Sequence, residues 1–394
     1  MGTTDWILAA YSILFCMAWY ISNIQAINAL FLVPLFEKEN PSIPKYWPRL
    51  SIVIAACNEA DIIEQAISTL LQQDYPDLEI ILVNDRSTDK TGDIIDNIAD
   101  RDARVQIIHI ENLPQGWLGK VYAMQVGTRK VSGEWILYTD ADVFFQQGAL
   151  RKAVAFAIAE QSDHLALMPA PDTDSFWLDV VMRTFGVLFL QSTRAADAGK
   201  PGSDVAIGVG AFNMVRKSVF DKTKGFEWLR MEVIDDVGLG LLLHDFGAKT
   251  SFAITRQDIS LTWYPSIRAM FKGLEKNLFG GAAHYSFLRM MFIVGLLWAF
   301  ALAPFVAIFA RVPYLWIFGV LVYLFIVAGA LVSKLILKQR LLPSLFVQVG
   351  QIIFSLMLLR SGVMCILRKG IIWRGTKYTI DDLRAGQRVK MQTF

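Results

Sequence analysis

The sequence predicts an α/β protein with a doubly wound, mostly parallel sheet, joined to helices that span a membrane. Two observations predict this fold class. Between residues 50 and 140, short apolar segments alternate with amphipathic ones, which is typical of the strands and helices of a parallel sheet. The whole chain is also 54% hydrophobic and 19% charged, which is more apolar than most soluble proteins. Part of the chain is therefore expected to lie in a membrane.

The alternating region divides into four strands and three connecting helices. Ser51–Ala56, Glu79–Val83 and Trp135–Asp140 are short apolar runs rich in residues that favour strands. Between the strands, apolar residues recur every three or four positions, as on one face of a helix. We expect strands at 51–56, 79–83, 105–110 and 135–140, and helices around 62–71, 89–100 and 119–131.

Polar side chains follow three of these strands. Asn58 and Glu59 come after the first strand, Asp85 after the second, and Asp140 and Asp142 at the end of the fourth. Because ligands of open α/β sheets bind beyond the carboxyl ends of the strands, these side chains are expected to share one rim. Two neighbouring carboxylates repel each other unless they share a cation, and divalent ions bound by carboxylates and substrate phosphates meet that need. The first hypothesis is a diphosphate held by a metal, and the alternative is an ordinary acidic turn.

Two further segments carry candidate functional residues. Gly116–Lys120 precedes an expected helix, whose free N–H groups and dipole favour an anion, although its spacing is not that of a P-loop and a plain surface turn is an alternative. Asp235 and Asp236 open another expected helix, where they either cap it or supply a general base. Gly208 and Gly210, which we expect to follow an apolar strand, would let a ligand approach the backbone closely.

Composition argues against several other kinds of site. The net charge of +2 and the lack of a basic run with interleaved aromatic residues argue against a nucleic-acid partner. The three cysteines lie far apart, so neither a disulfide framework nor a zinc site is indicated. The four histidines show no metal-ligand spacing, and we expect them to be core or surface residues.

Long apolar stretches predict the domain organisation. We expect a transmembrane helix at 1–33, a linker at 34–49, a catalytic domain at 50–286, a C-terminal membrane region at 287–367 and a basic tail at 368–394. A cleaved signal peptide is disfavoured because no Lys or Arg precedes the first apolar run. The first positive charges follow that run, so the positive-inside rule places the catalytic domain and the tail on the cytoplasmic side of the inner membrane.

The C-terminal membrane region contains two clear spans and one ambiguous segment. Phe287–Ala310 and Tyr314–Ser333 are expected to cross the membrane as a hairpin. Residues 341–367 are long enough to cross, but they include Arg360, and a full crossing would put the basic tail outside. An interfacial or re-entrant helix is therefore favoured there. The apolar stripe from Trp177 to Phe189 is expected to be helical, lying either in the core or on the membrane surface.

Five motifs in order carry a family resemblance: Ala56–Glu59, Val83–Asp89, Gly116–Lys120, Thr139–Asp142 and Ile234–Asp236. Together they resemble the membrane-bound family 2 glycosyltransferases with a GT-A fold, over roughly residues 50 to 285. The chain looks most similar to the branch of ceramide glucosyltransferases and of bacterial enzymes associated with hopanoid and carotenoid pathways, and Trp373–Tyr378 also looks familiar from such enzymes. The resemblance implies a nucleotide-sugar donor and a divalent metal, Mg²⁺ or Mn²⁺.

The resemblance also implies roles for individual residues. The donor would be bound by Asn58, Glu59, Asp85, Lys120 and Asp140. Asp140 and Asp142 would bind the metal, Asp142 more directly. Asp236 matches the second acidic residue of the family's Glu-Asp motif, the catalytic base, and Asp235 stands where the family has Glu.

One family motif is missing from the sequence. Family members often have Gln-x-x-Arg-Trp before the C-terminal spans, whereas the corresponding region here offers only Lys276 as a candidate ligand of the diphosphate. The missing motif is characteristic of processive polysaccharide synthases, so its absence argues against that activity.

These observations predict an inverting, metal-dependent hexosyltransferase. It would move a sugar from a nucleotide-diphosphate sugar, such as a UDP-sugar, to a hydroxyl of a membrane lipid of the glycolipid, hopanoid or carotenoid type. Transfer to a polyprenyl phosphate or to a cell-surface polysaccharide is the alternative. A catalytically inactive binder of sugar nucleotides is a third hypothesis. A transporter is disfavoured because the firm spans lack buried charge.

Overall fold

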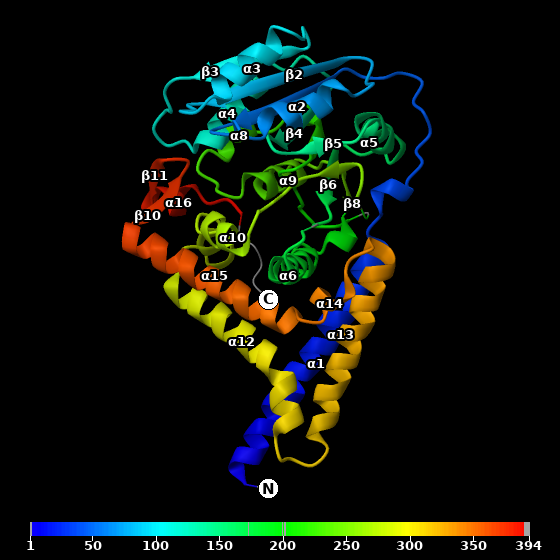
Figure 1. Cartoon of the computed structure of the whole chain (residues 1–394), viewed down its shortest axis with the longest axis vertical. Coiled ribbons are helices and arrows are strands. Elements are labelled where there is room, and N and C mark those ends of the chain that lie inside the picture. The colour runs from blue at the N-terminus through cyan, green and yellow to red at the C-terminus, as the bar shows by residue number, and fades with distance from the viewer. Residues whose placement is uncertain (1, 172, 199, 201, 390–394) are drawn as a thin grey trace.

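The structure, a computed structural model, describes residues 2–171, 173–198, 200 and 202–389, so part of the basic tail expected at 368–394 lies outside the described residues. An α/β domain forms one end of the molecule, and a bundle of long helices extends from it (Figure 1). The N-terminus lies at the far tip of that bundle, beside the connection between α12 (Phe287–Phe309) and α13 (Leu315–Leu337).

The α/β domain is built on a sheet whose order is β3-β2-β1-β4-β7-β6-β8 among the described residues. Its strands are β1 Leu50–Ala56, β2 Leu78–Asp85, β3 Val105–Ile110, β4 Trp135–Asp140, β6 His164–Pro169, β7 Asn213–Arg216 and β8 Thr250–Thr255. β1 pairs in parallel with both β2 and β4, and β2 pairs in parallel with β3. β7 is antiparallel to β4 and to β6. The four expected strands and the mostly parallel sheet are confirmed.

Helices cover both faces of this sheet, because the central strands are apolar on both sides. The connecting helices are α2 Ile63–Leu71, α3 Thr91–Ala99, α4 Gly119–Thr128 and α5 Ala149–Ala159. Val53 and Ile81 are buried in a core with residues of α4, and Ile52 and Ile80 are buried in a core with residues of α2. Each strand therefore stabilises two cores, and the ends of the strands are fixed in place.

The rest of the domain connects the sheet to the helical bundle. Its elements are β5 Phe144–Phe145, α6 Phe176–Ser192, α7 Lys217–Phe220, α8 Gly225–Trp228, α9 Asp235–Asp245, β9 Ile259–Ser260, α10 Ile267–Gly273 and α11 Leu278–Ala283. Two short 3-10 helices lie at Phe36–Lys38 and Ala195–Asp197. The apolar stripe at 177–189 is helical as expected, since it forms α6, and α6 packs on α15 (Val347–Arg368) and α1 (Thr3–Leu32).

The expected strand before Gly208 is wrong. Residues 203–209 have no regular secondary structure, and strand β7 begins after the glycines, at Asn213. The reason is a close approach between backbones: a Cβ on Gly240 of α9 would lie 2.2 Å from the carbonyl oxygen of Ile207, and one on Gly208 would lie 1.9 Å from that of Asp236. The apolar residues before Gly208 therefore pack against the start of α9 and do not form a strand.

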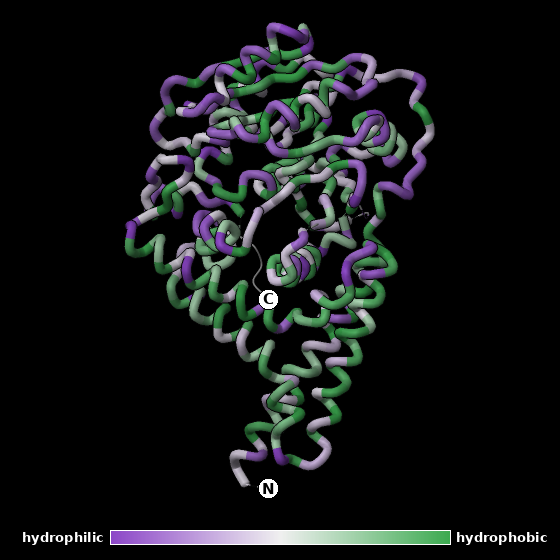
Figure 2. The backbone as a smooth tube through the Cα atoms, in the orientation of Figure 1, coloured by the Kyte–Doolittle hydropathy of each residue, from purple (hydrophilic) through white to green (hydrophobic). Residues whose placement is uncertain are grey.

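Four helices are long and apolar enough to cross a membrane among the described residues: α1 Thr3–Leu32, α12 Phe287–Phe309, α13 Leu315–Leu337 and α15 Val347–Arg368. The tube in Figure 2 is mostly hydrophobic along the bundle and mixed over the α/β domain. In Figure 1, α15 passes beneath the α/β domain, at an angle to α1 and α13.

Both ends of α15 are joined to the α/β domain. Just before α14 (Leu341–Ser344), Arg340 forms an ion pair with Asp179 of α6 at 3.1 Å. At the other end, Arg368 pairs with Glu275 at 2.9 Å. The hairpin of β10 Gly370–Trp373 and β11 Thr376–Thr379, followed by α16 Ile380–Gly386, then packs on the domain. The chain thus returns to the domain on both sides of α15.

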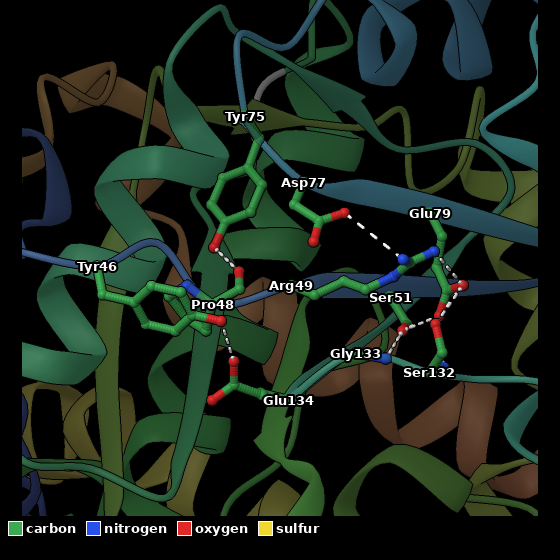
Figure 3. A network of polar contacts seen from close by, with 10 residues as sticks. All are labelled: Tyr46, Pro48, Arg49, Ser51, Tyr75, Asp77, Glu79, Ser132, Gly133 and Glu134. Carbon is green, nitrogen blue, oxygen red and sulfur yellow. Dashed lines mark hydrogen bonds and ion pairs between the residues drawn. The ribbon is translucent and has the colours of Figure 1, made fainter.

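A polar network closes the edge of the sheet opposite the strand ends that carry the acidic residues (Figure 3). Glu79, only 2% exposed, accepts hydrogen bonds from the hydroxyl of Ser51, from the backbone and hydroxyl of Ser132, and from Arg49 at 3.1 Å. Burial by itself would raise the pKa of Glu79, but these hydrogen bonds outweigh it and hold the pKa below its usual value. The carboxylate therefore joins the linker, β1 and β2 at one point.

We expect Glu79→Ala to destabilise the protein, because the donors around the carboxylate would lose a charged partner, which costs about 1.5–3 kcal/mol. The measurement is the midpoint of thermal unfolding of the detergent-solubilised full chain. Glu134→Ala, which removes the exposed partner of Tyr46 in the same network, is the matched control and should change the midpoint little. Equal shifts for both variants would contradict the role given to Glu79.

Candidate functional site

The carboxyl ends of β1, β2 and β4 meet at one polar pocket with a volume of about 170 Å³. The sequence-predicted residues that line it are Glu59, Asp85, Lys120, Asp140 and Asp142. The parallel register explains this meeting, because β1 lies between β2 and β4 and all three run in the same direction. Three segments distant in sequence thus bring their acidic residues together at one rim.

Lys120 is the cation at the centre of this acidic group. It lies in the first turn of α4, and its ammonium is 2.8 Å from Asp140 and 3.4 Å from Asp235. Burial by itself would lower the pKa of Lys120, but the charges of Asp140, Asp235 and Asp236 outweigh it and hold the pKa well above its usual value. Lys120 therefore stays charged and joins the end of β4 to the start of α9.

The carboxylate of Asp236 is held by backbone groups. Its Oδ2 accepts a hydrogen bond from the N–H of Gly210 at 2.9 Å, and its Oδ1 accepts one from Val237 at 2.9 Å. A Cβ on Gly210 would lie 2.8 Å from Oδ2 of Asp140 and 3.4 Å from Oδ2 of Asp236. A side chain at position 210 would crowd these carboxylates, so Gly210 allows Asp140 and Asp236 to lie close together. Burial raises the pKa of Asp236 and also that of Asp235.

Asp142 is destabilised in its charged form. Burial, followed by the charges of Asp140 and Glu59, raises its pKa to about 6. A bound cation would relieve this repulsion. Among the described residues, no group of three or more His, Cys, Asp or Glu side chains could hold a metal ion by itself. The donor set instead fits an ion that takes one or two carboxylates and completes its shell with substrate phosphates and water, as Mg²⁺ does.

Asp85 and Arg86 form the side of the pocket that faces the start of α4. Arg86 makes hydrogen bonds at 2.8 and 3.2 Å to the two carboxylate oxygens of Asp85, which is 3% exposed. A Cβ on Gly119 would lie 2.3 Å from Oδ2 of Asp85, so the glycine before Lys120 is required for the close approach of α4. The Gly-Lys pair thus places a cation and a helix start beside the acidic rim.

Asn58 lies at the rim but does not line the pocket. Its side-chain oxygen accepts hydrogen bonds from the backbone of Thr88 at 2.8 Å and of Asp89 at 3.3 Å. It adopts a left-handed conformation, with φ of 57°. Unlike the other donor-binding residues expected from the sequence, Asn58 does not line the pocket. It joins the loop after β1 to the loop after β2.

Several pocket residues were missed by sequence reasoning or weighed only as a guess. Lys276 lines the pocket, as do Trp373, Arg374 and Tyr378 of the C-terminal hairpin. Burial, with the charge of Lys120, lowers the pKa of Lys276 to about 8. The segment Trp373–Tyr378 resembles one in the family, but it follows the long apolar helices, and no periodicity or spacing indicates that it returns to β1 and β2.

Comparison with known proteins supports this fold. Residues 51–224 match the family described as "Glycosyl transferase family 2". A mannosyltransferase from Pyrobaculum calidifontis, solved in complex with GDP-Man and Mn²⁺, superposes with a TM-score of 0.51 at 15% identity, covering 92% of this chain and 99% of its own. Residues 51–224 are therefore similar in sequence to family 2 glycosyltransferases, and the α/β region has a GT-A-like fold.

Two curated relatives have named activities. The GalNAc(5)-diNAcBac-PP-undecaprenol beta-1,3-glucosyltransferase of Campylobacter jejuni is 33% identical over 26% of this chain and 32% of its own length. The 4,4'-diaponeurosporenoate glycosyltransferase of Staphylococcus haemolyticus is 22% identical over 64% of this chain and 68% of its own length. The chain spans only 32% to 45% of the length of four curated relatives that it matches at 31% identity or more.

Removal of one rim carboxylate should make the protein more stable at neutral pH. Because the pKa of Asp142 is raised in the folded state, its charge opposes folding above about pH 6. This destabilisation decreases as the pH falls toward the lower pKa that Asp142 has in the unfolded chain. We expect Asp142→Asn to raise the unfolding midpoint at pH 7.5 by about 2–4 °C, the shift that 1 kcal/mol gives in a domain of this size. The gain should disappear near pH 4.

The measurement is a series of unfolding midpoints from pH 4 to pH 8 without divalent ions. Asp61→Asn, at an exposed position near the same rim, is the matched control and should leave the midpoint unchanged throughout. A loss of stability in Asp142→Asn at pH 7.5 would show that the repulsion described here is absent.

Proposed function

We propose that this chain is an inverting glycosyltransferase that moves a sugar from a nucleotide-diphosphate sugar to a hydroxyl of a membrane lipid. The observation that carries the proposal is the joint position of Asp140, Lys120 and Asp236, which brings the rim of the polar pocket next to a backbone-held carboxylate. The pocket rim with Asp140 and Lys120 suits a leaving diphosphate, and the carboxylate of Asp236 suits a general base. Both are needed for one displacement at a sugar carbon.

The donor would lie across the carboxyl ends of the strands. Glu59 and Asp85 would contact the nucleoside, and Asn58 would act by positioning the two loops that carry them. Lys120 and Lys276, which both line the pocket, would face the diphosphate. The mannosyltransferase that shares this fold was solved with a nucleotide-sugar donor, which supports a donor of this class.

Asp140 and Asp142 would hold a divalent ion, Mg²⁺ or Mn²⁺, together with the diphosphate. When bound, such an ion neutralises the charge that develops on the leaving group. The raised pKa of Asp142 supports this role, because two acidic neighbours disfavour its charged form until a cation is present. The Mn²⁺ in the mannosyltransferase complex is consistent with the same role.

Asp236 would take the proton of the acceptor hydroxyl. Its two oxygens are fixed by the N–H groups of Gly210 and Val237, so the carboxylate is oriented before the acceptor arrives. Burial raises its pKa, which makes the carboxylate a stronger base than an exposed aspartate. Asp235, held by Lys120, would keep the start of α9 in place.

A hydrocarbon-bearing acceptor fits the cavity beside the catalytic domain. This cavity, of about 560 Å³, is lined mainly by apolar residues of α1, α6, α12 and α13, and by Met168–Pro171 at the end of β6. β4 and β6 are both antiparallel to β7 and so run the same way, which puts Pro169 on the same edge of the sheet as Asp140. The two named relatives carry a diphospho-undecaprenol and a diaponeurosporenoate in their names, and both support a lipid acceptor.

This arrangement suggests how the chain lies in the membrane. Three helices, α1, α12 and α13, would cross it, and α15 would lie at the interface, because both of its ends are bound to the α/β domain. The catalytic domain and the tail would then share the cytoplasmic side of the inner membrane. An acceptor lipid would reach the active site from the bilayer.

The proposal predicts that Asp236→Asn loses transfer into lipid by about 10²–10⁴-fold, the usual contribution of a general base. Membranes containing the full chain would be incubated with a panel of radiolabelled sugar nucleotides, with and without chelator, and the label in the extracted lipid counted. Donor binding should survive in this variant, because Asp236 lies outside the polar pocket.

Each outcome of this experiment bears on a different part of the proposal. Asp245→Asn, at the exposed end of the same helix, is the matched control and should transfer normally. If no donor transfers label into the lipid extract, the proposal of a lipid acceptor is wrong. Transfer that persists in Asp236→Asn would indicate an acceptor that is already an anion, such as a polyprenyl phosphate. If transfer continues in the presence of chelator, the proposed dependence on a divalent metal ion is wrong.

The apolar cavity can be tested by filling it. Gly186 of α6 lines the cavity, and a Cβ added there would meet no atom within 4 Å, so Gly186→Phe should fold and occupy the space of the acceptor hydrocarbon. We expect transfer into lipid to fall by about tenfold or more, since each buried CH₂ of a displaced chain contributes about 0.8 kcal/mol. Hydrolysis of the donor by water should be unchanged.

Gly295→Phe is the matched control for this substitution. Gly295 also has open space around its Cβ, but it lies on the exposed face of α12 and does not line the cavity. Both substitutions remove a glycine from a helix, which should favour folding by a similar amount. Equal transfer by the two variants would contradict a role for the cavity in acceptor binding.

A further inference from the structure

The C-terminal hairpin of β10 and β11 closes the donor pocket from the far end of the chain. The hairpin, through its turn and strand β11, contacts three separate parts of the rim. Arg374 forms an ion pair with Glu59, Thr376 accepts a hydrogen bond from Arg86 at 3.3 Å, and the hydroxyl of Tyr378 accepts one from the N–H of Gly119 at 3.1 Å. One short hairpin therefore touches the loop after β1, the loop after β2 and the start of α4.

The backbone of Arg374 is held in an unfavourable conformation. Arg374 and Gly375 form the tight turn of the hairpin and have φ of 48° and 79°. Positive φ at both central positions is the pattern of a type I′ turn, which favours Asn followed by Gly. An arginine there costs backbone energy, and such strain tends to persist where a side chain is needed. Asn58 and Arg86, on the facing loops of the rim, have positive φ of 57° as well.

The charge pattern at the hairpin is suited to an anion. The ammonium of Lys276 lies 3.8 Å from the centre of the Trp373 ring, and among the described residues no carboxylate lies within ion-pair distance of it. Arg374 has one partner, Glu59, and its side chain is 44% exposed, so the guanidinium can move without disturbing a core. The hairpin thus adds a half-exposed guanidinium to the pocket that Asp140 and Asp142 also line, and its indole covers the ammonium of Lys276.

We propose that Arg374 binds the diphosphate of the nucleotide-sugar donor, leaving Glu59 when the donor enters the pocket. This inference rests on the proposed function, because it needs a donor with a diphosphate. Arg374 and Trp373 supply an arginine and an indole to the pocket from a segment after the membrane helices.

The guanidinium of Arg374 is chemically suited to binding a diphosphate. The planar guanidinium presents parallel N–H donors that match phosphate oxygens, and these charge-assisted hydrogen bonds are stronger than neutral ones. Arg374 pairs with the single carboxylate of Glu59, and a diphosphate, which carries more negative charge, would compete for the same guanidinium. Burial raises the pKa of Glu59, and the charge of Arg374 opposes that rise.

The decisive variant is Arg374→Asn. Asparagine is preferred at this position of a type I′ turn, so the hairpin should fold at least as well as in the wild type while the cation is lost. We expect the affinity of the full chain in detergent for a nucleoside diphosphate with Mn²⁺ to fall about tenfold to a hundredfold, as for the loss of a charged hydrogen bond. The affinity for the corresponding nucleoside monophosphate should change much less.

The measurement is titration calorimetry with UDP, UMP, GDP and GMP, together with the unfolding midpoint of each variant. Arg374→Lys should keep part of the affinity, because it retains the charge without the fork of donors. Lys377→Asn, at an exposed position of the same hairpin, is the control and should bind as the wild type does.

The outcomes separate this inference from the proposed function. If the wild type binds neither diphosphate, the proposed function fails, whatever Arg374 does. If the wild type binds one of them and Arg374→Asn binds it equally well, the role of Arg374 is wrong and the proposed function stands. Equal losses for the diphosphate and the monophosphate, or an unfolding midpoint below that of the wild type, would show that the arginine only holds the hairpin in place.

Discussion

The ammonium of Lys120, 2.8 Å from Asp140 and 3.4 Å from Asp235, is the interaction on which the site depends. Without a cation there, the end of β4 and the start of α9 would bring carboxylates together in a partly buried space, and their repulsion would oppose folding. Two glycines make this approach sterically feasible: Gly119 against Asp85, and Gly210 between Asp140 and Asp236. Fold and chemistry thus share one constraint, since the acidic groups that would serve a donor are tolerated only because a fixed lysine offsets them.

The long apolar helices also fix the position of the C-terminal hairpin. α15 is joined to the domain before its start, by Arg340 and Asp179, and at its end, by Arg368 and Glu275, and the chain then continues into the hairpin over the pocket. The apolar cavity lies between the same helices and the end of β6. The donor side and the lipid side of the proposed reaction are therefore connected through α15, which gives a physical reason why the two parts belong to one chain.

The sequence predicted what depends on local pattern and failed where distant segments meet. The strands at 51–56, 79–83, 105–110 and 135–140 were predictable because apolar runs alternate with amphipathic ones, and parallel register then placed Glu59, Asp85 and Asp140 at one rim. The strand expected before Gly208 was wrong because those apolar residues pack against the backbone of α9, a contact with no periodicity. Trp373 and Arg374 could not be placed for a similar reason, since their contacts are distant in sequence: Arg374 pairs with Glu59, and Trp373 packs on Lys276.

The most direct test of the central claim is whether the acidic rim holds a metal ion in contact with a diphosphate. Electron–nuclear double resonance of Mn²⁺ added to the full chain with UDP or GDP would detect ³¹P next to the ion. We expect a phosphorus coupling for the wild-type protein, at protein concentrations where nucleotide and Mn²⁺ alone give little signal, and its loss in Asp142→Asn. A phosphorus-coupled signal of equal strength in Asp142→Asn, or bound Mn²⁺ without phosphorus coupling in the wild type, would contradict it.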